Sequence, residues 1–366
     1  MKEAFLFMPH VFTKVQLKFL KDNFPNRFDC FVIRLCNDTF PKIEEAIEVN
    51  CTSKKEYRKA IFEVLEKYDV VYLVPSFFSP GLKLYFWLFH RNLIKKIVWI
   101  EWGYDLYLTK GVSIIGYLKY LGKRIAQLTF ERSIPYFVAI HPVDITEYHK
   151  RIRGKAIILY APYRFSVEQD SDLLNYEKIS ISDKIKQGLP LYVQINNCIE
   201  SGMNHIDILR RLRKFADENI RIVLPMAYGN FSYMPVVEEY ANKCFPGKVI
   251  CWKDYVSYDE YKKRISQIDI FILGVARQRA LGNIHSFMYM QKKIFLPSNS
   301  QLYRYYQENN ISIYKLDDLD VMDFSDLCSD DDLSSEREYV LSLYSESPLV
   351  QWKRVFDYIK NNFNNK

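Results

Sequence analysis

Short apolar segments alternate with segments of helical spacing through the second half of the chain. The apolar segments are rich in Ile, Val, Leu and Phe, which is typical of buried strands in a parallel sheet. Between them apolar residues recur every three or four positions, as at Ile206, Leu209 and Leu212, which predicts amphipathic helices. The predicted strands cover residues 189–195, 220–226, 248–252, 268–273, 294–297 and 311–316, and the predicted helices 205–215, 236–244, 258–267 and 302–308. This alternation predicts a Rossmann-like α/β domain.

The first half of the chain repeats the alternation. Its predicted strands cover residues 4–8, 27–35, 69–74, 97–101, 136–141 and 156–160, and its predicted helices 15–23, 54–67, 82–93 and 114–132. Since 366 residues exceed the size at which one core usually keeps growing, we predict two domains. They cover residues 1–165 and 189–333, joined by a polar linker at 166–188. A C-terminal helical segment, 334–366, is predicted to cross back and pack on the first domain.

Charge and aromatic content point to an anionic partner. The formal net charge is +7, which fits a nucleic acid, a membrane surface or a charged small molecule. Residues 82–93 and 114–132 interleave bulky aromatics with Lys and Arg, so these helices either rest on an anionic bilayer or simply cover the sheet with solvated lysines. The apolar run at the start is too short for a secretory signal, and no stretch of 18 apolar residues occurs. We therefore expect a cytoplasmic protein.

The sequence predicts neither a metal site nor a cofactor. The seven cysteines are scattered without CxxC spacing, which indicates free buried thiols. Asp318 and Asp320 form a D-x-D pair, but they lie in an acidic run after the last strand, where a solvated loop is the simpler interpretation. No GxGxxG and no Walker motif is present, which argues against a dehydrogenase and an ATPase.

The segment at residues 268–293 combines a strand, a glycine-bearing turn and a helix. Gly274, Arg277 and Arg279 lie in the turn. A helix N-terminus offers free backbone N–H groups and a positive dipole end, and two guanidinium groups beside it favour an anionic ligand, most simply a diphosphate. The alternative is an ordinary turn with solvent-facing arginines.

Three loops at strand ends of the second domain carry most of its polar candidates. In a parallel sheet these loops open on the same edge, where they can cap phosphate-binding helices, allow close backbone approach or stack on a base or sugar. The predicted donor-binding residues are Asn196, Ser201, Asn204, His205, Tyr228, Asn230, Tyr233, Arg277, Arg279, Gly282 and Asn283.

Three residues at strand ends of the first domain are candidates for a catalytic base. Glu101 and Asp105 lie in the loop after a strand, where Gly103 permits tight approach, and His10 follows the first strand directly. Each could accept a proton from an acceptor hydroxyl, and the sequence does not rank them. A histidine after a strand also commonly serves as a capping or packing residue.

Four segments together resemble a known family. They are WGYDLY at 102–107, SGMNH at 201–205, LPMAYGNFSY at 224–233 and ARQRALGNIHSF at 276–287. In order and spacing they resemble the bacterial 4-acetamido-4,6-dideoxygalactose (Fuc4NAc) transferases of glycosyltransferase family 56, which build enterobacterial common antigen on an undecaprenyl-diphosphate lipid. The resemblance covers residues 100–316 and is densest in the second domain.

The resemblance implies a GT-B fold, in which two Rossmann-like domains face a central cleft. It implies metal-independent hexosyl transfer from a nucleotide-diphosphate sugar, TDP-Fuc4NAc in that family, with the donor in the second domain and the acceptor in the first. The implied partners are that nucleotide sugar, an undecaprenyl-diphosphate-linked acceptor and the anionic inner-membrane surface, to whose cytoplasmic face the protein would attach peripherally. No nucleic-acid partner is expected.

Two other classes of function remain as alternatives. One is an epimerase or hydrolase of related fold that acts on nucleotide sugars without a lipid. The other is a non-catalytic module that binds a membrane or nucleic acid, for which salt-sensitive DNA binding without nucleotide-sugar binding would be diagnostic. Whether the anomeric configuration is inverted or retained does not follow from the sequence.

Overall fold

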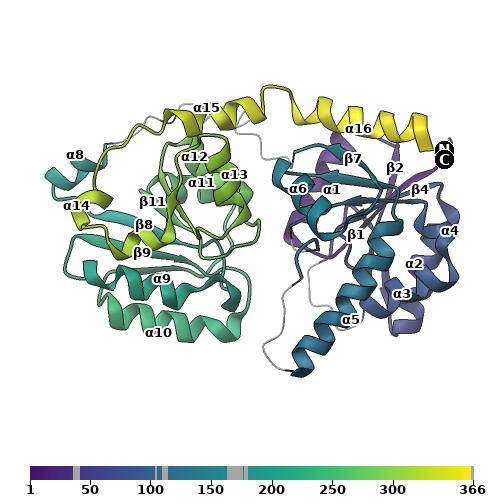
Figure 1. The fold of residues 1–366 in the computed structure, drawn as a ribbon, viewed down its shortest axis with the longest axis horizontal. Coiled ribbons are helices and arrows are strands. Elements are labelled where there is room, and N and C mark those ends of the chain that lie inside the picture. Colours follow the sequence, from purple (N-terminus) through teal and green to yellow (C-terminus); the bar gives the residue numbers. More distant parts are fainter. Residues whose placement is uncertain (36–41, 104, 109–113, 163–175, 177–179, 364–366) are drawn as a thin grey trace. The chain divides into compact units, whose positions relative to one another are not determined.

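The computed structural model describes residues 1–35, 42–103, 105–108, 114–162, 176 and 180–363. The chain divides into two compact units, one formed by Met1–Arg164 with Glu346–Lys366 and the other by Phe165–Ser345. Parallel strands alternate with helices in both units (Figure 1), which confirms the predicted α/β class with two Rossmann-like domains. Of the predicted linker at 166–188, all but residues 176 and 180–188 lie outside the described part of the chain.

The first unit is built on a seven-stranded sheet with the order β3-β2-β1-β4-β5-β6-β7, in which every pairing is parallel. Its strands are β1 (Glu3–Phe7), β2 (Phe28–Leu35), β3 (Ile47–Cys51), β4 (Val70–Val74), β5 (Ile97–Ile100), β6 (Tyr136–Ala139) and β7 (Ile157–Tyr160). Its helices are α1 (Val11–Asn23), α2 (Lys54–Lys67), α3 (Pro80–Phe89), α4 (Arg91–Ile94), α5 (Ile114–Phe130), α6 (Pro142–Arg151) and α16 (Pro348–Asn362).

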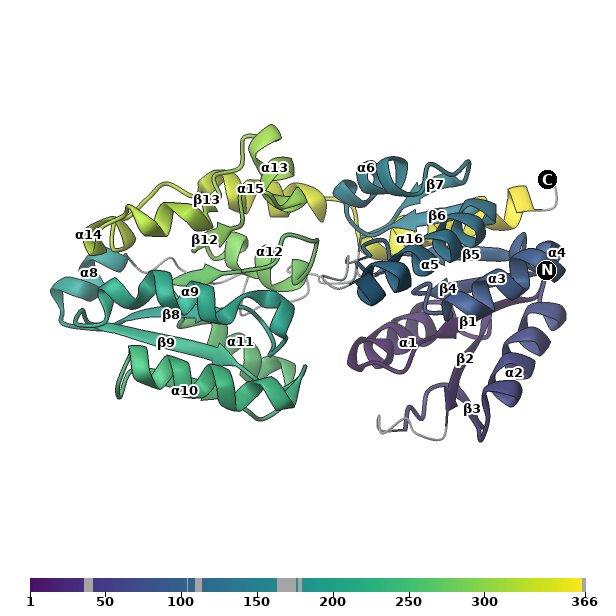
Figure 2. The same cartoon turned by 60° about the horizontal axis from the view of Figure 1, so that its bottom comes forward.

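Each face of this sheet has its own apolar core. Successive residues of β1 point to opposite faces, so Ala4 and Leu6 pack under α2, α3 and α6, whereas Phe5 and Phe7 pack under α1 and α16 (Figures 1 and 2). Phe356 of α16 contacts Phe5 edge to face, with ring centroids 5.9 Å apart. The C-terminal helix is therefore part of the first unit's core.

The second unit is built on a six-stranded parallel sheet with the order β10-β9-β8-β11-β12-β13. Its strands are β8 (Leu191–Ile195), β9 (Ile220–Pro225), β10 (Val249–Trp252), β11 (Ile270–Ile272), β12 (Lys293–Leu296) and β13 (Tyr314–Lys315). Its helices are α8 (Ile181–Lys186), α9 (His205–Leu212), α10 (Met234–Cys244), α11 (Tyr258–Ser266), α12 (Leu281–Tyr289), α13 (Gln301–Glu308), α14 (Phe324–Leu327) and α15 (Ser334–Leu343).

The helices of the second unit also cover both faces of its sheet (Figure 1). Leu191, Val193 and Ile195 of β8 point into the core beneath α9 and α10. On the other face Phe271 of β11 stacks on Phe287 of α12, with ring centroids 4.7 Å apart. Strands and helices therefore form three layers, and the loops at the carboxyl ends of the strands share one edge.

The predicted C-terminal helical segment forms two helices instead of one. The first, α15, belongs to the second unit, where the Arg337 guanidinium donates to the Tyr289 hydroxyl at 3.2 Å. The second, α16, belongs to the first unit. The break has a local cause: Ser347 caps α16 by accepting a hydrogen bond from Leu349 N, and Pro348 is favoured at a first helical position.

Candidate functional site

The sheet of the second unit reverses its strand order between β8 and β11. These two strands pair directly although the chain forms β9 and β10 between them. Loops that leave the carboxyl ends of such a strand pair diverge, and this is where ligands bind in open α/β sheets. The loop at 196–204 follows β8 and the loop at 273–280 follows β11, so predicted residues of both loops come to the same edge.

Asn196 and Asn204 hold these two loops together. The buried Asn196 side chain accepts from Gly274 N at 2.9 Å and donates to the Met203 carbonyl at 3.0 Å. Asn204 Nδ2 donates to the Gly274 carbonyl at 2.7 Å. Both asparagines have positive φ, near 59° and 56°, a conformation that Asn tolerates better than most residues. A Cβ at Gly274 would collide with the Met203 carbonyl oxygen, so this close approach requires glycine.

Arg279 is the central cation of this edge. Its guanidinium donates from Nη2 to Cys198 Sγ at 2.9 Å. Burial raises the pKa of the Cys198 thiol to about 11 although the Arg279 charge opposes that shift, so the thiol is neutral at pH 7. Among the described residues no carboxylate forms an ion pair with Arg279. Arg277 is close enough for its charge also to lower the Cys198 pKa, so both guanidinium groups share this edge.

His205 begins α9 beneath the same edge and is a neutral residue. Its side chain is buried, and burial lowers its pKa to about 4, with the Arg279 charge acting in the same direction. Backbone groups of Cys198 and Glu200 oppose this shift. The imidazole therefore adds no positive charge near neutral pH, and Arg277 and Arg279 supply the charge at this edge.

Tyrosines connect the edge to its neighbouring loops. The Tyr228 hydroxyl accepts from Asn197 Nδ2 at 2.6 Å, and burial raises its pKa above the usual value. Arg279 and the ionisable groups of Cys198, Tyr261 and Tyr255 lie close enough to Tyr228 to influence its pKa, which places them around it. Tyr261 of α11 donates from its hydroxyl to Asn283 Oδ1 at 3.0 Å. Tyr255 is 73% exposed, so an aromatic side chain is open to solvent near Tyr228.

The N-terminus of α12 completes the edge. Ala280 adopts a left-handed conformation (φ 58°) as the N-cap residue and makes no side-chain capping bond. Gly282 and Asn283 occupy the second and third helical positions and are half-buried. The first N–H groups of a helix have no partner within the helix, so they are available to an anion here.

Three predicted donor residues lie farther along the rim. Asn230 is exposed, and its Oδ1 accepts from Ser232 N at 3.2 Å and from Ser232 Oγ at 2.6 Å, so the side chain caps a short turn. The Tyr233 ring lies 6.0 Å from the His205 ring. Ser201 is exposed in the turn before Asn204. Of these three residues, Tyr233 is thus the one that contacts a residue near Arg279, through His205.

The acidic run after the last strand forms contacts within the second unit. Arg211 of α9 pairs with Asp317 at 3.2 Å and with Asp320 at 2.5 Å. Asp318 accepts from Lys315 N at 3.1 Å. Asp317 and Asp320 therefore hold this segment against α9, and Asp318 caps the turn itself, which agrees with the interpretation of the D-x-D pair as part of a loop.

Glu101 of the first unit lies in the protein interior. Its side chain is 0% exposed and accepts a hydrogen bond from Gly103 N. Burial raises its pKa well above the usual range, and the neighbouring charges of Asp144 and Asp105 add to that shift. The pKa of Asp144 is also raised, to about 8, mainly by burial. Two buried carboxyl groups in contact favour a shared proton, and this burial argues against the base role predicted for Glu101.

Asp105 fixes the loop in which it lies. It accepts hydrogen bonds from Ser76 N at 2.9 Å, Trp99 Nε1 at 2.5 Å and Trp102 N at 3.1 Å. Its carboxyl group is buried, and burial raises its pKa. Because three donors already use both of its oxygens, Asp105 is better placed to hold the loop than to take a proton from a substrate.

His10 lies at the equivalent edge of the first sheet. It follows β1, which pairs with β4 at the point where the strand order of this sheet reverses. Its side chain is half-buried, and its ring centroid lies 5.5 Å from that of Trp102. Of the three predicted bases, His10 is thus the one with a solvent-accessible side chain at a ligand-binding edge.

Comparison with known proteins identifies the family. The sequence model of the 4-alpha-L-fucosyltransferases, glycosyl transferase group 56, matches residues 11–359. The chain belongs to this family. This confirms the resemblance seen in the four sequence segments and identifies the protein as a glycosyltransferase.

Solved structures show the fold of this transferase in distant proteins. A glycosyltransferase from Rickettsia africae is 14% identical over 98% of both chains, with a TM-score of 0.62. Anabaena Alr3699/HepE in complex with UDP-glucose is 12% identical over 99% of this chain and 100% of that chain, with a TM-score of 0.66. The trehalose-6-phosphate protein from E. coli bound with UDP-2-fluoro glucose is 8% identical, covers 98% and 99% of the two chains, and has a TM-score of 0.59. The transferase has the GT-B fold.

Four residues of the candidate site were missed by sequence reasoning. Asn197 and Cys198 directly follow a predicted strand, so their position alone marked them as candidates. Tyr255 follows another strand and carried the same signal. Tyr261 lies inside α11, and only the tertiary structure brings its hydroxyl to Asn283.

Proposed function

We propose that this transferase moves a deoxyamino sugar of the 4-acetamido-4,6-dideoxygalactose type from a nucleotide-diphosphate donor to a saccharide on polyprenyl diphosphate. The family supports sugar transfer, and the nucleotide sugars named for the Anabaena and E. coli proteins support this class of donor. One observation of the structure carries the proposal. Arg279 lies beside the N-terminus of α12 at the switch point of the second sheet, without a carboxylate partner among the described residues.

The leaving group determines what this edge has to do. When the sugar–phosphate bond breaks, negative charge grows on the diphosphate of the departing nucleotide. Arg277, Arg279 and the first N–H groups of α12 would stabilise that charge, and they do so best when they are already held in place. Cys198, Asn196 and Asn204 hold the surrounding loops, so little reorganisation is needed during the reaction. The nucleotide base would stack on an aromatic face such as that of Tyr255.

The acceptor hydroxyl must lose a proton as it attacks the sugar. We assign this proton to His10, because histidine is the most common general base in enzymes and this side chain is accessible at the edge of the first sheet. Trp102 packs against His10 and is positioned in turn through its backbone N–H by Asp105. In this proposal Glu101 and Asp105 shape the acceptor site without touching the substrate.

The first unit also carries a surface suited to an anionic membrane. Apolar side chains of α5 and α3 are exposed, at Ile115, Tyr117, Leu118, Leu121, Ile125, Leu88 and Phe89. On α5, Ile115, Leu118 and Ile125 form one stripe, and the exposed Lys119 and Lys123 flank it. Within the described residues, no helix is long and apolar enough to cross a membrane. We propose that this stripe rests on the cytoplasmic face of the inner membrane, where a lipid-linked acceptor for a surface polysaccharide such as enterobacterial common antigen resides.

The proposal is tested by product analysis with the full-length protein. TDP-, UDP- and GDP-sugars, including TDP-Fuc4NAc, are incubated with and without a polyprenyl-diphosphate-linked saccharide, and products are identified by mass spectrometry. We expect a lipid-linked product that is one deoxyamino sugar heavier, together with free nucleoside diphosphate, only when the acceptor is present.

Other products would point to the alternative functions. Free sugar formed equally well without acceptor would identify a hydrolase, and an isomerised nucleotide sugar would identify an epimerase. Salt-sensitive binding of DNA, without binding of any nucleotide sugar, would identify a binding module. Any of these three results contradicts the proposed transfer.

A further inference from the structure

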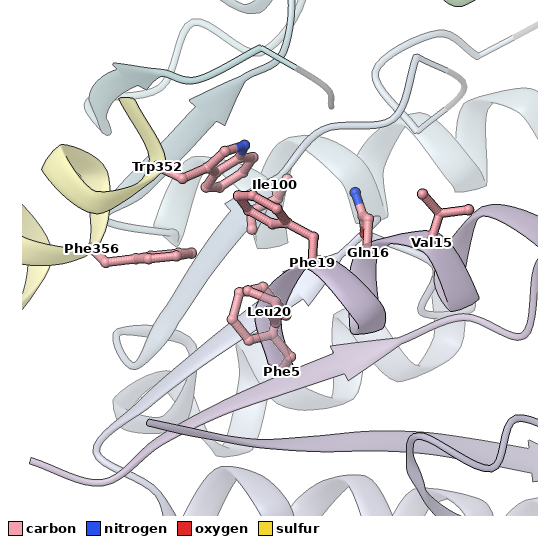
Figure 3. Close-up of a pocket in the computed structure, with 8 residues that line it drawn as sticks. All are labelled: Phe5, Val15, Gln16, Phe19, Leu20, Ile100, Trp352 and Phe356. Atoms are coloured by element: carbon pink, nitrogen blue, oxygen red, sulfur yellow. The ribbon is translucent and has the colours of Figure 1, made fainter. Parts of the chain in front are cut away.

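The gap between α1 and α16 in the first unit is not a ligand site. Its walls include Phe5, Phe19, Leu20, Trp352 and Phe356, which belong to the core on that face of the sheet (Figure 3). The space between them is about 30 Å³, close to the volume of one water molecule. A ligand of this unit has to bind on its surface.

Four arginines gather where α5 and α6 end. They are Arg124 of α5, Arg132 of the 3₁₀ turn η1 (Glu131–Ser133) that follows it, and Arg151 and Arg153 at the end of α6. Arg124 Nη2 donates to the Arg151 carbonyl, and Arg132 Nε donates to the Ile152 carbonyl at 2.5 Å. A Cβ at Gly154 would lie 3.5 Å from the Arg132 Cα, so the turn after α6 runs directly against Arg132.

The four charges are close enough to affect one another. Burial lowers the pKa of Arg124, and the charges of Arg151, Arg132 and Arg153 act in the same direction although Tyr120 opposes them. Charges that lie within about 8 Å of one another are only partly screened at physiological ionic strength. An anion bound between these arginines would relieve their mutual repulsion.

One carboxylate neutralises part of this charge. Glu147 of α6 forms an ion pair with Arg151. Among the residues that the structure describes, the other three arginines form no ion pair. Glu131 precedes Arg132 in the chain, but its buried carboxylate pairs with Lys83 instead. Most of the positive charge of the cluster is therefore not balanced by acidic side chains.

The end of α6 accounts for a small share of the charge. The last carbonyls of a helix carry about half a negative charge, and cations beside them stabilise the helix. The four arginines and Glu147 together carry a charge of +3, so about +2.5 remains after the helix end is included. The exposed Lys150 and Lys155 add to it. Capping of the helix is therefore not enough to explain the cluster.

The cluster lies apart from the edge assigned to sugar transfer. Helices α5 and α6 each lead into a strand, β6 and β7, and these two strands are parallel. Arg132 and Arg153, at the ends of the helices, therefore lie at the amino edge of the sheet. His10 and Trp102 follow strands at its carboxyl edge. A ligand of Arg132 and Arg153 would occupy a site of its own.

Two members of the cluster also contact the loop after β5. The Arg151 guanidinium lies 4.7 Å from the centre of the Tyr107 ring. Arg124 Nη1 donates to Gln127 Oε1 at 2.5 Å, and Gln127 Nε2 donates to the Asp105 carbonyl at 3.0 Å. Arg124 and Arg151 thus have a structural role as well, so Arg132 and Arg153 are the residues to substitute.

We infer that Arg132 and Arg153, together with Arg124 and Arg151, bind a phosphomonoester group at the amino edge of the first sheet. Such a group carries about −1.5 to −2 charges near pH 7, which matches the charge that remains on the cluster. Guanidinium groups also pair with two phosphate oxygens at once. A nucleic acid fits less well, because its row of singly charged phosphates needs an extended basic surface.

The phosphate can belong to a lipid head group or to a soluble metabolite, and two probes distinguish these sources. Binding of glycerol 3-phosphate to the full-length protein is measured by calorimetry at constant ionic strength, with excess TDP to occupy the donor site and glycerol as the control ligand. Co-sedimentation compares vesicles of phosphatidic acid, a phosphomonoester, with phosphatidylglycerol vesicles of equal surface charge. Tighter binding of phosphatidic acid than of glycerol 3-phosphate assigns a lipid head group, and the reverse assigns a soluble ligand.

Substitutions locate the site. Arg132→Gln/Arg153→Gln should weaken the tighter of the two probes at least tenfold. Arg213→Gln/Arg304→Gln removes two exposed arginines of the second unit and should leave that probe unaffected. Arg153→Glu keeps the bond from Arg132 to Ile152 and serves if the double variant does not fold. Equal binding by the Arg132/Arg153 variant and the wild type, or equal losses in both double variants, would overturn the inference.

These outcomes are independent of the proposed function and of the membrane surface on α5. Leu118→Glu/Ile125→Glu should lower binding to both kinds of vesicle, whereas Arg132→Gln/Arg153→Gln should remove only a preference for phosphatidic acid. A protein that transfers sugar and binds vesicles, yet binds neither phosphomonoester through Arg132 and Arg153, would overturn this inference alone. A protein that binds one of them through these arginines and transfers no sugar would support the site and contradict the transferase proposal.

Discussion

Arg279 is the single residue on which the donor site depends most. Its guanidinium is held by a neutral thiol and not by a carboxylate, so its positive charge remains available to a ligand. An arginine in this arrangement can bind and stabilise the negative charge that develops on a leaving diphosphate. An arginine that is already paired with a carboxylate would first have to break that ion pair.

Replacement of Arg279 should therefore reduce turnover. For Arg279→Ala we expect kcat to fall about 10²–10³-fold, as when one preorganised donor to a developing anion is removed. Steady-state transfer kinetics with the nucleotide sugar measure this effect. Arg213→Ala removes an exposed arginine at the end of α9 and should leave kcat within about twofold. If the Arg279 variant keeps the wild-type kcat, the guanidinium has no role in leaving-group stabilisation.

His205 is a second residue with a measurable consequence. Its pKa is about 4 in the folded protein and about 6.5 in an unfolded chain. Between these values the unfolded chain binds more protons, so stability is lost as the pH falls from 6.5 toward 4. From pH 6.5 to pH 5 the loss from one such histidine is about 2 kcal/mol. His285, also buried with a pKa of about 4, adds a similar contribution.

The variant His205→Gln tests this effect because glutamine has no proton to gain. Denaturant unfolding of the second unit, followed at pH 6.5 and at pH 5, should show about 2 kcal/mol less acid-induced loss in this variant than in the wild type. The two proteins are compared by how much their free energy of unfolding changes between the two pH values. Their absolute stabilities are not compared, because the buried glutamine amide of the variant lowers its stability at every pH. Identical losses in both proteins would show that His205 is already protonated at pH 5.

At the scale of the helices and strands, sequence pattern predicted most of the fold. Long apolar segments such as 69–74 and 220–226 became central strands, because a strand buried on both faces is apolar throughout. The edge strand β3, Ile47–Cys51, was missed. Its residues are mostly half-buried or exposed and its sequence, IEVNC, mixes polar and apolar positions, so periodicity carried little signal.

The candidate site was predictable in part, for a physical reason. Strand order places Asn196, Tyr228 and Arg279 at one edge, and alternation of strands and helices is enough to infer that edge. The sequence does not show which polar side chain turns inward. Asn196 and Asn204 brace loops, and Glu101 is buried against Asp144, because tertiary contacts decide these orientations. Only the structure therefore distinguishes the residues that could contact a ligand from those that support the surrounding loops.

The helix α5 permits a test of the membrane surface. Leu118→Glu/Ile125→Glu adds two negative charges to the exposed apolar stripe and should reduce co-sedimentation with phosphatidylglycerol vesicles at least tenfold. Lys119→Gln/Lys123→Gln should reduce it as well, since each lysine near an anionic surface contributes about 1 kcal/mol.

The matched control for α5 is Leu341→Glu, because Leu341 is an exposed leucine on α15 in the other unit. It should leave vesicle binding unchanged, apart from a small effect of its one added charge. Should Leu341→Glu and the α5 variants lower vesicle binding equally, the surface would have to be sought elsewhere on the protein. Binding to neutral phosphatidylcholine vesicles separates the apolar from the electrostatic contribution.

The two units of the molecule are not two consecutive halves of its sequence. The first unit is assembled from both ends of the sequence, since α16 places Trp352, Val355, Phe356 and Ile359 in the core over β1. Arg27 of the first unit also pairs with Asp357 of α16 at 3.1 Å. The first unit therefore needs the C-terminal helix, whereas the second is continuous in sequence and has its own core.

The two units should respond to pH in opposite directions. In the first, burial raises the pKa of Glu101, Asp105, Glu131 and Asp144, so the folded unit keeps protons that the unfolded chain releases. The stability that these acids contribute is fully present below about pH 4, which is near their pKa in an unfolded chain. This contribution is lost as the pH rises toward the Asp144 pKa of about 8. In the second unit, the buried histidines produce the opposite dependence below pH 6.5.

Calorimetric unfolding at pH 5 and pH 8 measures both responses, and added nucleoside diphosphate identifies the second unit's transition by shifting it upward. As the pH rises from 5 to 8, we expect the unfolding temperature of the first unit to fall and that of the second unit to rise.

Glu101→Gln, which cannot ionise, should make the first transition less sensitive to pH and leave the second unchanged. Glu63→Gln, at an exposed position of α2, should alter neither, because that carboxyl group is solvated in both states. Movement of both transitions in the same direction would contradict a shared proton at Glu101 and Asp144, since loss of that proton is what should weaken the first unit alone at high pH.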